Sequence, residues 1–199
     1  MKSKKKYRFS FTATSLRTLE FVEVAKWEDF DDTTELELSI GNGKSNTGKR
    51  MLSELVRWRD VLTPDQLELL INGSRETQNK IAFLAVCKCY DFIREFVIEV
   101  VREKFMFYDY VISDGDYLTF FRSKSYQFEE LEDLTDLTQA KIKQVIFKML
   151  EQAGIIDSVT TRNILPQILD DKLIKVISSE DKEYLKFFLY SDSDIELLT

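Results

Sequence analysis

The residues that most resemble a known phosphate-binding motif lie in the one glycine-rich segment of the chain, GNGKSNTGKR. Gly43, Gly48 and Lys49 have the G-x-x-x-x-G-K spacing, in which backbone amides and a lysine cradle nucleotide phosphates. The motif continues with Ser or Thr, which binds Mg²⁺, but Arg50 occupies that position. The phosphate-binding motif also follows a buried strand. Here the preceding residues, 35–40, instead alternate acidic and apolar side chains. We therefore expect a flexible, basic surface loop here rather than a nucleotide-binding site.

Histidine-dependent chemistry is excluded, because the chain contains no histidine and only 2 cysteines. Neither a Ser-His-Asp or Cys-His relay nor a His-based zinc, iron or copper site can be built. Cys87 and Cys89 supply too few thiols for a zinc site and lack the CxxC spacing of redox motifs. Three pairs of aspartates lie beside turn residues and are typical of turns or helix caps: Asp114 and Asp116, Asp170 and Asp171, and Asp192 and Asp194. We expect a non-enzymatic protein that needs no metal, cofactor or small-molecule substrate.

Basic side chains that could contact nucleic-acid phosphates fall in three groups. The first is an N-terminal arm, the second includes the glycine-rich segment, and the third lies on one face of a later helix and in the segment after it. The candidate DNA-binding residues are Lys4, Lys5, Lys6 and Arg8 in the arm, Lys44, Lys49, Arg50 and Arg57 in the second group, and Lys141, Gln144, Lys148 and Arg162 in the third. Each group is also compatible with an ordinary solvated surface.

The helix that must position the third group is the clearest element of the sequence. Apolar residues recur along residues 138–153 at the spacing of one helical face, with Thr138 and Gly154 as candidate caps. Lys141, Gln144 and Lys148 recur at i, i+3 and i+7 and therefore share the opposite face. A short acidic helix before it and a β-hairpin after it would complete a winged helix-turn-helix. An amphipathic helix with a solvated polar face has the same spacing.

Composition favours an all-α fold. The chain has 199 residues, 44% of them hydrophobic, but only 6 glycines and 2 prolines. We expect a compact multi-helix protein with one short β-hairpin at most. An N-terminal region over residues 1–110 would hold the basic arm and the core helices, with a break near Tyr90. A C-terminal, winged-helix-like region over residues 111–199 would pack against it as one unit.

The acidic excess lies in the second half of the chain. Residues 1–100 carry 16 basic and 16 acidic side chains, so the net charge of -7 arises from residues 101–199. Any DNA contact must therefore depend on local basic patches rather than on the total charge. No apolar run is long enough to cross a bilayer, and the basic N-terminus lacks the apolar stretch of a secretory signal. We expect a cytoplasmic protein without a membrane partner.

Several blocks of the sequence resemble the BrxA family of bacteriophage-exclusion (BREX) defence systems. These blocks are YRFSFTATSLRTLEFVEVAKW, GKRMLSELVRWRDVLTPDQLELL, LTQAKIKQVIFKMLEQAGII and ILPQIL. The likeness covers most of the chain and is weakest in residues 29–46 and after residue 175. It implies a compact helical protein with helix-turn-helix or winged-helix elements, a fold also compared with the antitermination protein NusB. It further implies binding of double-stranded DNA, without strong sequence preference, alongside other BREX proteins.

The leading hypothesis is therefore a DNA-binding accessory protein of a phage-defence system. Two alternatives remain open. The acidic C-terminal half could dock a basic protein within the defence complex, or the chain could bind RNA as the comparison with NusB suggests.

Overall fold

The computed structural model describes residues 6–28 and 32–198, and in these residues the regular secondary structure is helical, with only isolated β-bridges. In the first part of the chain the helices are η1 (Ser10–Ala13), α1 (Thr18–Lys26), α2 (Thr34–Ile40), α3 (Ser45–Asp60), α4 (Pro64–Asn72), α5 (Arg75–Cys89) and α6 (Asp91–Phe96). In the second part they are η2 (Val97–Arg102), α7 (Glu103–Met106), α8 (Asp114–Ser125), α9 (Glu129–Glu132), α10 (Asp136–Gln152), α11 (Asp171–Ser178), η3 (Lys182–Phe188) and α12 (Asp192–Leu197). The all-α prediction is confirmed.

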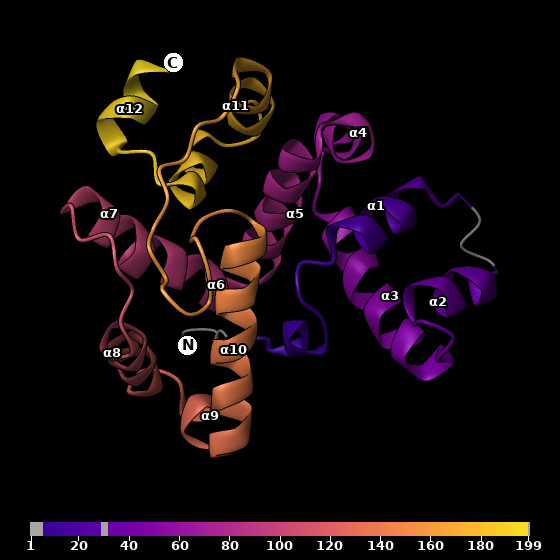
Figure 1. Ribbon diagram of the computed structural model, residues 1–199, viewed down its shortest axis with the longest axis horizontal. Coiled ribbons are helices and arrows are strands. Elements are labelled where there is room, and N and C mark those ends of the chain that lie inside the picture. The colour runs from indigo at the N-terminus through magenta and orange to yellow at the C-terminus, as the bar shows by residue number, and fades with distance from the viewer. Residues whose placement is uncertain (1–5, 29–31, 199) are drawn as a thin grey trace, which may run out of the picture.

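Helices α5, α6 and α10 run through the middle of the molecule, and the other helices surround them (Figure 1). Helices α1 and α2 pack on α3, while α4 contacts α1, α5 and α11. The C-terminal elements close over the same centre, because η3 contacts α5, α11, α12 and η2. A single cluster of buried hydrophobic side chains extends through all these layers.

Helix α5 lies at the centre because its sequence is apolar around its whole circumference. Residues 81–87, IAFLAVC, are fully buried, as expected for a helix surrounded by other helices. The break expected near Tyr90 is confirmed: Tyr90 is extended, with φ -126° and ψ 100°, and α6 begins at Asp91. The π-helical turn η2 that follows was not predicted.

One aspartate of each pair takes part in a helix cap, as the sequence predicted. Asp116 and Asp194 complete capping boxes with the serines that precede α8 and α12, and Asp170 caps α11. The cap predicted for the later basic helix is wrong. Thr135 rather than Thr138 caps α10, because the Thr135 hydroxyl accepts a hydrogen bond from the Thr138 amide.

A buried carboxylate joins three parts of the N-terminal half. Glu54 of α3 accepts a hydrogen bond from the Tyr90 hydroxyl, a second from the Ser10 hydroxyl at 3.1 Å, and a third from the Arg57 guanidinium at 2.7 Å. Trp58 Nε1 donates to the Tyr90 oxygen at 3.0 Å. Burial and the bond to Glu54 raise the pKa of Tyr90 above its usual value. The network fixes η1 and the α5–α6 junction on α3.

Replacing Glu54 should destabilise the fold far more than replacing an exposed glutamate. In Glu54→Ala the two hydroxyls and the Arg57 guanidinium lose their buried acceptor, which should lower the free energy of unfolding by about 3 kcal/mol. The matched control is Glu68→Ala, whose exposed ion pair with Lys172 spans 3.9 Å and should contribute less than about 0.5 kcal/mol. Urea denaturation measures both, and equal midpoints would contradict a central role for Glu54.

Candidate nucleic-acid interface

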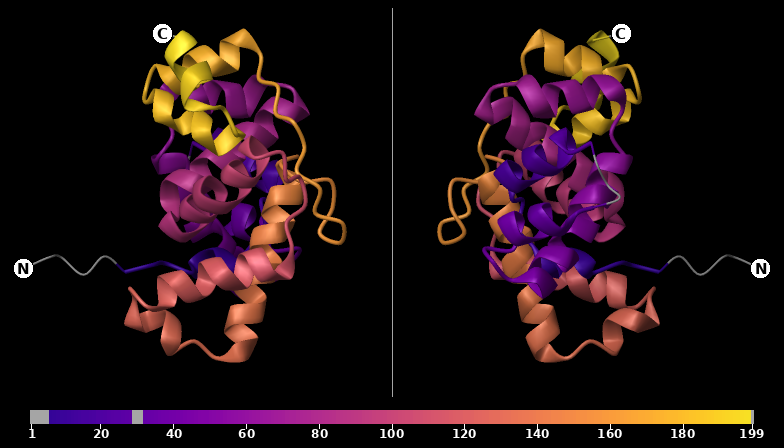
Figure 2. Two further views of the ribbon diagram at one scale, coloured as in Figure 1. Left: turned by 90° about the vertical axis from the view of Figure 1, so that its left-hand side faces the viewer. Right: turned by 90° about the vertical axis from the view of Figure 1, so that its right-hand side faces the viewer.

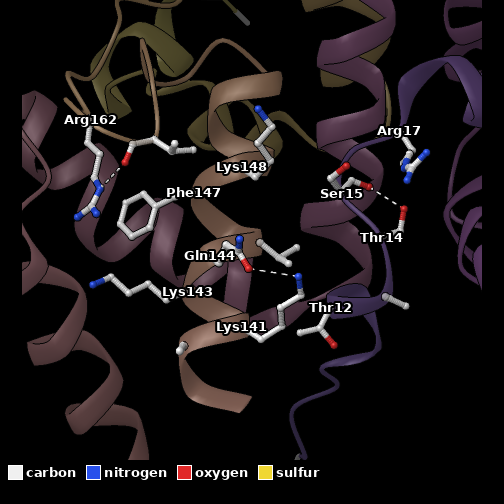
Figure 3. Close-up of a pocket in the computed structure, with 14 residues that line it drawn as sticks. Thr12, Thr14, Ser15, Arg17, Lys141, Lys143, Gln144, Phe147, Lys148 and Arg162 are labelled. Atoms are coloured by element: carbon white, nitrogen blue, oxygen red, sulfur yellow. Dashed lines mark hydrogen bonds between the residues drawn. The ribbon is translucent and has the colours of Figure 1, made fainter. Parts of the chain in front are cut away.

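A groove of about 590 Å³ lies on the outer face of α10 (Figure 3). The helix forms its floor, the loop around residue 162 borders one side, and residues 12–17 border the other. We call it the α10 groove. Its cationic lining residues are Arg17, Lys141, Lys143, Lys148 and Arg162. None of the described residues that line it is acidic, so the groove carries a concentrated positive charge inside an acidic protein.

The floor of the α10 groove is the polar face that the sequence predicted. Helical periodicity buries the apolar face of α10 in the core and leaves Lys141, Gln144 and Lys148 exposed along the opposite side (Figure 3). Lys141 Nζ donates a hydrogen bond to Gln144 Oε1 at 3.2 Å. Lys148 forms an ion pair with Glu151, which lowers the pKa of that carboxyl.

Arg162 is held at the edge of the groove by contacts on every side. Its guanidinium carbon lies 4.4 Å from the centre of the Phe147 ring, and its Nε donates to the Val159 carbonyl at 3.0 Å. Its Nη1 donates to the Asp114 carboxylate, which also accepts from Lys143 Nζ at 2.7 Å. These two cations lower the pKa of Asp114 to about 2. A fixed arginine loses little side-chain entropy when it binds a phosphate.

The loop that carries Arg162 is closed by backbone pairing. The expected β-hairpin is reduced to one antiparallel bridge between Ile156 and Ile164, and a second bridge joins Val111 to Asn163. Within this loop Arg162 adopts a left-handed backbone with φ 54°.

A buried lysine fixes the far end of that loop to the core. Lys80 donates to the side-chain oxygen of Gln167, and Gln167 Nε2 donates to the carbonyls of Gly154 and Leu165, each at 2.8 Å. Burial lowers the pKa of Lys80 to about 8. Gly154, with φ 70°, ends α10 in the left-handed conformation, as the sequence predicted.

The sequence did not predict the side of the groove that residues 12–17 form. The amide of Leu16 donates to Gln152 Oε1 at 2.9 Å, which fastens residues 12–17 to the end of α10. Arg17 then lines the groove from a left-handed backbone, φ 44°, with its guanidinium 2.7 Å from Glu20. No helical periodicity marks this segment, so the only available signal was the isolated charge of Arg17.

Arg50 is the member of the second basic group that approaches the α10 groove. It lines a small adjoining pocket of about 160 Å³ together with Ala13, Asn46 and Thr47. Ala13 also lines the groove, and η1 packs on both α3 and α10. The N-terminal end of α3 therefore borders the same surface.

The other members of the second group lie elsewhere. Lys44 and Lys49 are exposed but line neither the groove nor the pocket beside it. Arg57 is half-buried and donates to Glu54, so its guanidinium is part of the buried network.

The glycine-rich segment is not the flexible loop that we expected. Only residues 41–44 form a turn, because α3 begins at Ser45 and contains Gly48. A Cβ atom on Gly48 would lie 1.9 Å from the carbonyl oxygen of Glu37, so this glycine allows α2 and α3 to pack closely. The preceding element is a helix rather than a strand, and the segment offers no phosphate cradle.

The described residues of the N-terminal arm, Lys6 and Arg8, do not line the groove. Lys6 and Arg8 are exposed, whereas Lys4 and Lys5 lie outside the described residues. Tyr7 is buried between them, and its hydroxyl donates to Glu95 Oε2 at 2.6 Å. Figure 2 shows the described beginning of the chain and the loop after α10 on opposite sides of the molecule.

Fold and site together define an all-α protein with a cationic surface groove. A crystal structure of an uncharacterized protein from Magnetospirillum magneticum has the same fold, with a TM-score of 0.78 and 15% identity over 93% of this chain and 98% of that chain. The BrxA family model matches residues 5–181, and the chain belongs to the BrxA family. This confirms the resemblance seen in the sequence.

One curated relative is the "BREX protein BrxA" of Bacillus cereus (strain H3081.97), 29% identical over 106 residues. The match spans 53% of this chain and 53% of the relative, so it covers about half the length of each. Within the part of the chain that the structure describes, no helix combines the length and apolarity needed to cross a bilayer.

Removing the carboxylate beside the groove should strengthen the binding of a polyanion. Asp114→Asn deletes a negative charge that lies against both Lys143 and Arg162, so affinity for duplex DNA should rise about threefold to tenfold at low salt. The gain should shrink as salt screens the charges. Glu68→Gln removes an equal charge from α4 and serves as the control in the same fluorescence anisotropy titration. Equal affinities for the two variants would mean that Lys143 and Arg162 do not face the ligand.

Proposed function

We propose that this protein is a non-enzymatic, DNA-binding accessory component of a BREX-type phage-defence system. The observation that carries the DNA-binding proposal is the α10 groove, which collects cations from three separate segments and has no acidic residue in its described lining. Membership of the BrxA family and the name of the Bacillus cereus relative support the assignment to BREX. Other BREX proteins are the partners that this assignment implies.

Phosphate contact is the main mode of binding that we infer. Lys141 and Lys148 are seven residues apart, about 10 Å along the helix axis. Duplex DNA presents about six phosphates over that length, so both lysines can engage its backbone. Arg17 and Arg162 approach from the two sides of the same groove. Binding would release condensed counterions, and affinity should therefore fall steeply with salt.

We infer that α10 and the loop after it act as the recognition helix and wing of a winged helix-turn-helix. Support comes from the short acidic helix α9 before α10, the bridged loop after it, and the restrained position of Arg162. Gln144 is the exposed amide on this helix that could reach a base edge. With one such residue among several cations, we expect weak sequence preference, because phosphate contacts carry no sequence information.

The acidic excess restricts where DNA can bind. The charge of -7 arises from residues 101–199, yet four of the five cations that line the α10 groove also come from this region. Electrostatic attraction would therefore act at the groove, while the acidic surroundings repel DNA from other orientations.

Neutralising the floor of the groove should weaken binding and reduce its salt dependence. For Lys141→Gln combined with Lys148→Gln, we expect the slope of log affinity against log salt to fall by about 2, because two phosphate contacts are lost. Affinity at low salt should fall about tenfold or more. Fluorescence anisotropy with a labelled duplex measures both quantities.

The matched control is Lys172→Gln combined with Lys175→Gln, which removes two lysines from α11 and should leave binding unchanged. Absence of duplex binding at low salt, or binding indifferent to salt, would contradict the proposal. An RNA duplex of the same sequence is titrated in parallel, and tighter binding to RNA would favour the NusB-like alternative.

A further inference from the structure

The loop between α7 and α8 exposes a run of large apolar side chains. Phe107 and Tyr108 are 78% and 81% exposed, and Tyr110 and Val111 follow at 42% and 48%. We call residues 107–111 the aromatic loop. Isolated exposed apolar residues are common, but consecutive ones form a patch, and such patches mark interaction surfaces. Tyrosine and phenylalanine are also the side chains that most often anchor protein partners.

The aromatic loop is held in one conformation. Tyr108 has φ 60°, an uncommon backbone for a bulky side chain, and its amide donates to the Phe105 carbonyl at 3.1 Å. The carbonyl of Tyr110 accepts from the Ile164 amide at 2.7 Å, and the Tyr110 ring lies 5.5 Å from the Phe105 ring. A surface that is already ordered loses less entropy on binding.

Ion pairs beside the loop bury the cation and expose the carboxylate. Lys104 is 15% exposed, and its Nζ lies 2.5 Å from a carboxylate oxygen of Asp109, which is 60% exposed. Arg102 is 7% exposed, and its guanidinium lies 3.5 Å from Glu103, whose side chain is 49% exposed. The charge that faces solvent around the aromatic rings is therefore negative.

We propose that the aromatic loop, with Asp109 within it and Glu103 on the preceding helix α7, is a docking surface for an arginine-rich segment of a partner protein. A guanidinium group stacks on tyrosine and phenylalanine rings and bonds to carboxylates, so it matches both features of this surface. The exposed carboxylates repel nucleic acid and acidic peptides. The surface shares no lining residue with the α10 groove, but it adjoins the groove, because Val111 bridges to Asn163, the residue after Arg162.

The test uses the full chain and synthetic labelled peptides in which arginine alternates with serine. Fluorescence anisotropy compares this probe with peptides that carry lysine or glutamate in place of arginine. We expect the arginine peptide to bind tighter than the lysine peptide, because lysine lacks the planar group that stacks on rings. The glutamate peptide can bind only at the cationic α10 groove, so its affinity should be the same in Tyr108→Asn as in wild type.

Tyr108→Asn removes the most exposed ring of the aromatic loop. It places there a residue type that tolerates a left-handed backbone. It should weaken binding of the arginine peptide about tenfold, and Asp109→Asn should weaken it severalfold. The control is Tyr126→Asn, which removes an equally exposed tyrosine at the end of α8 and should leave binding unchanged. Matching urea denaturation curves would show that the variants are folded.

Three results would overturn the proposal. The first is equal affinity for the arginine peptide in wild type and Tyr108→Asn. In the second, Tyr108→Asn weakens the binding of duplex DNA, which would place the aromatic loop in the nucleic-acid interface. In the third, sedimentation shows self-association of the wild type that Tyr108→Asn abolishes, which would make a second copy of the chain the occupant.

Discussion

The buried carboxylate of Glu54 is the interaction on which the candidate interface depends. A charge inside a protein must be surrounded by donors, and here the donors come from η1, from α3 itself and from the α5–α6 junction. Satisfying them places η1 against α3, and η1 also packs on α10. Residues 12–17, which include the end of η1, border the exposed face of α10. The buried charge of Glu54 thus helps to position one side of the groove.

Carboxylates also restrain the cations of the α10 groove without lining it. Asp114 forms ion pairs with Lys143 and Arg162, and Glu151 forms one with Lys148 while accepting a hydrogen bond from the Val159 amide at 3.2 Å. These contacts fix the positions of flexible side chains before any ligand binds. They also partly neutralise the cations, so a polyanion must compete with them. The arrangement favours a moderate, salt-sensitive affinity for polyanions. Such an affinity is what we propose for contacts with the phosphate backbone of DNA.

The parts of the structure that could be predicted are those encoded by neighbouring residues. The spacing of Ile142, Val145 and Ile146 predicted which face of α10 is buried, and therefore which face exposes Lys141 and Lys148. The same local signals predicted the break at Tyr90. Arg17 and the segment of residues 12–17 that carries it could not be predicted to line the groove, because that segment is positioned by Gln152, which is far away in the sequence. The expectation of a flexible loop in the glycine-rich segment was wrong, because Gly48 lies within α3 and allows that helix to pack closely on α2.

The most direct test of a DNA interface on α10 is lysine footprinting by acetylation and mass spectrometry, with and without duplex DNA. Lys141 and Lys148 are exposed in the groove, whereas Lys172 is exposed on α11 and serves as the internal reference. We expect DNA to slow acetylation of Lys141 and Lys148 about tenfold at low salt, and to leave Lys172 unchanged. Protection of Lys172 with free access to Lys141 and Lys148, or no protection of any of them, would contradict the assignment of this face to DNA.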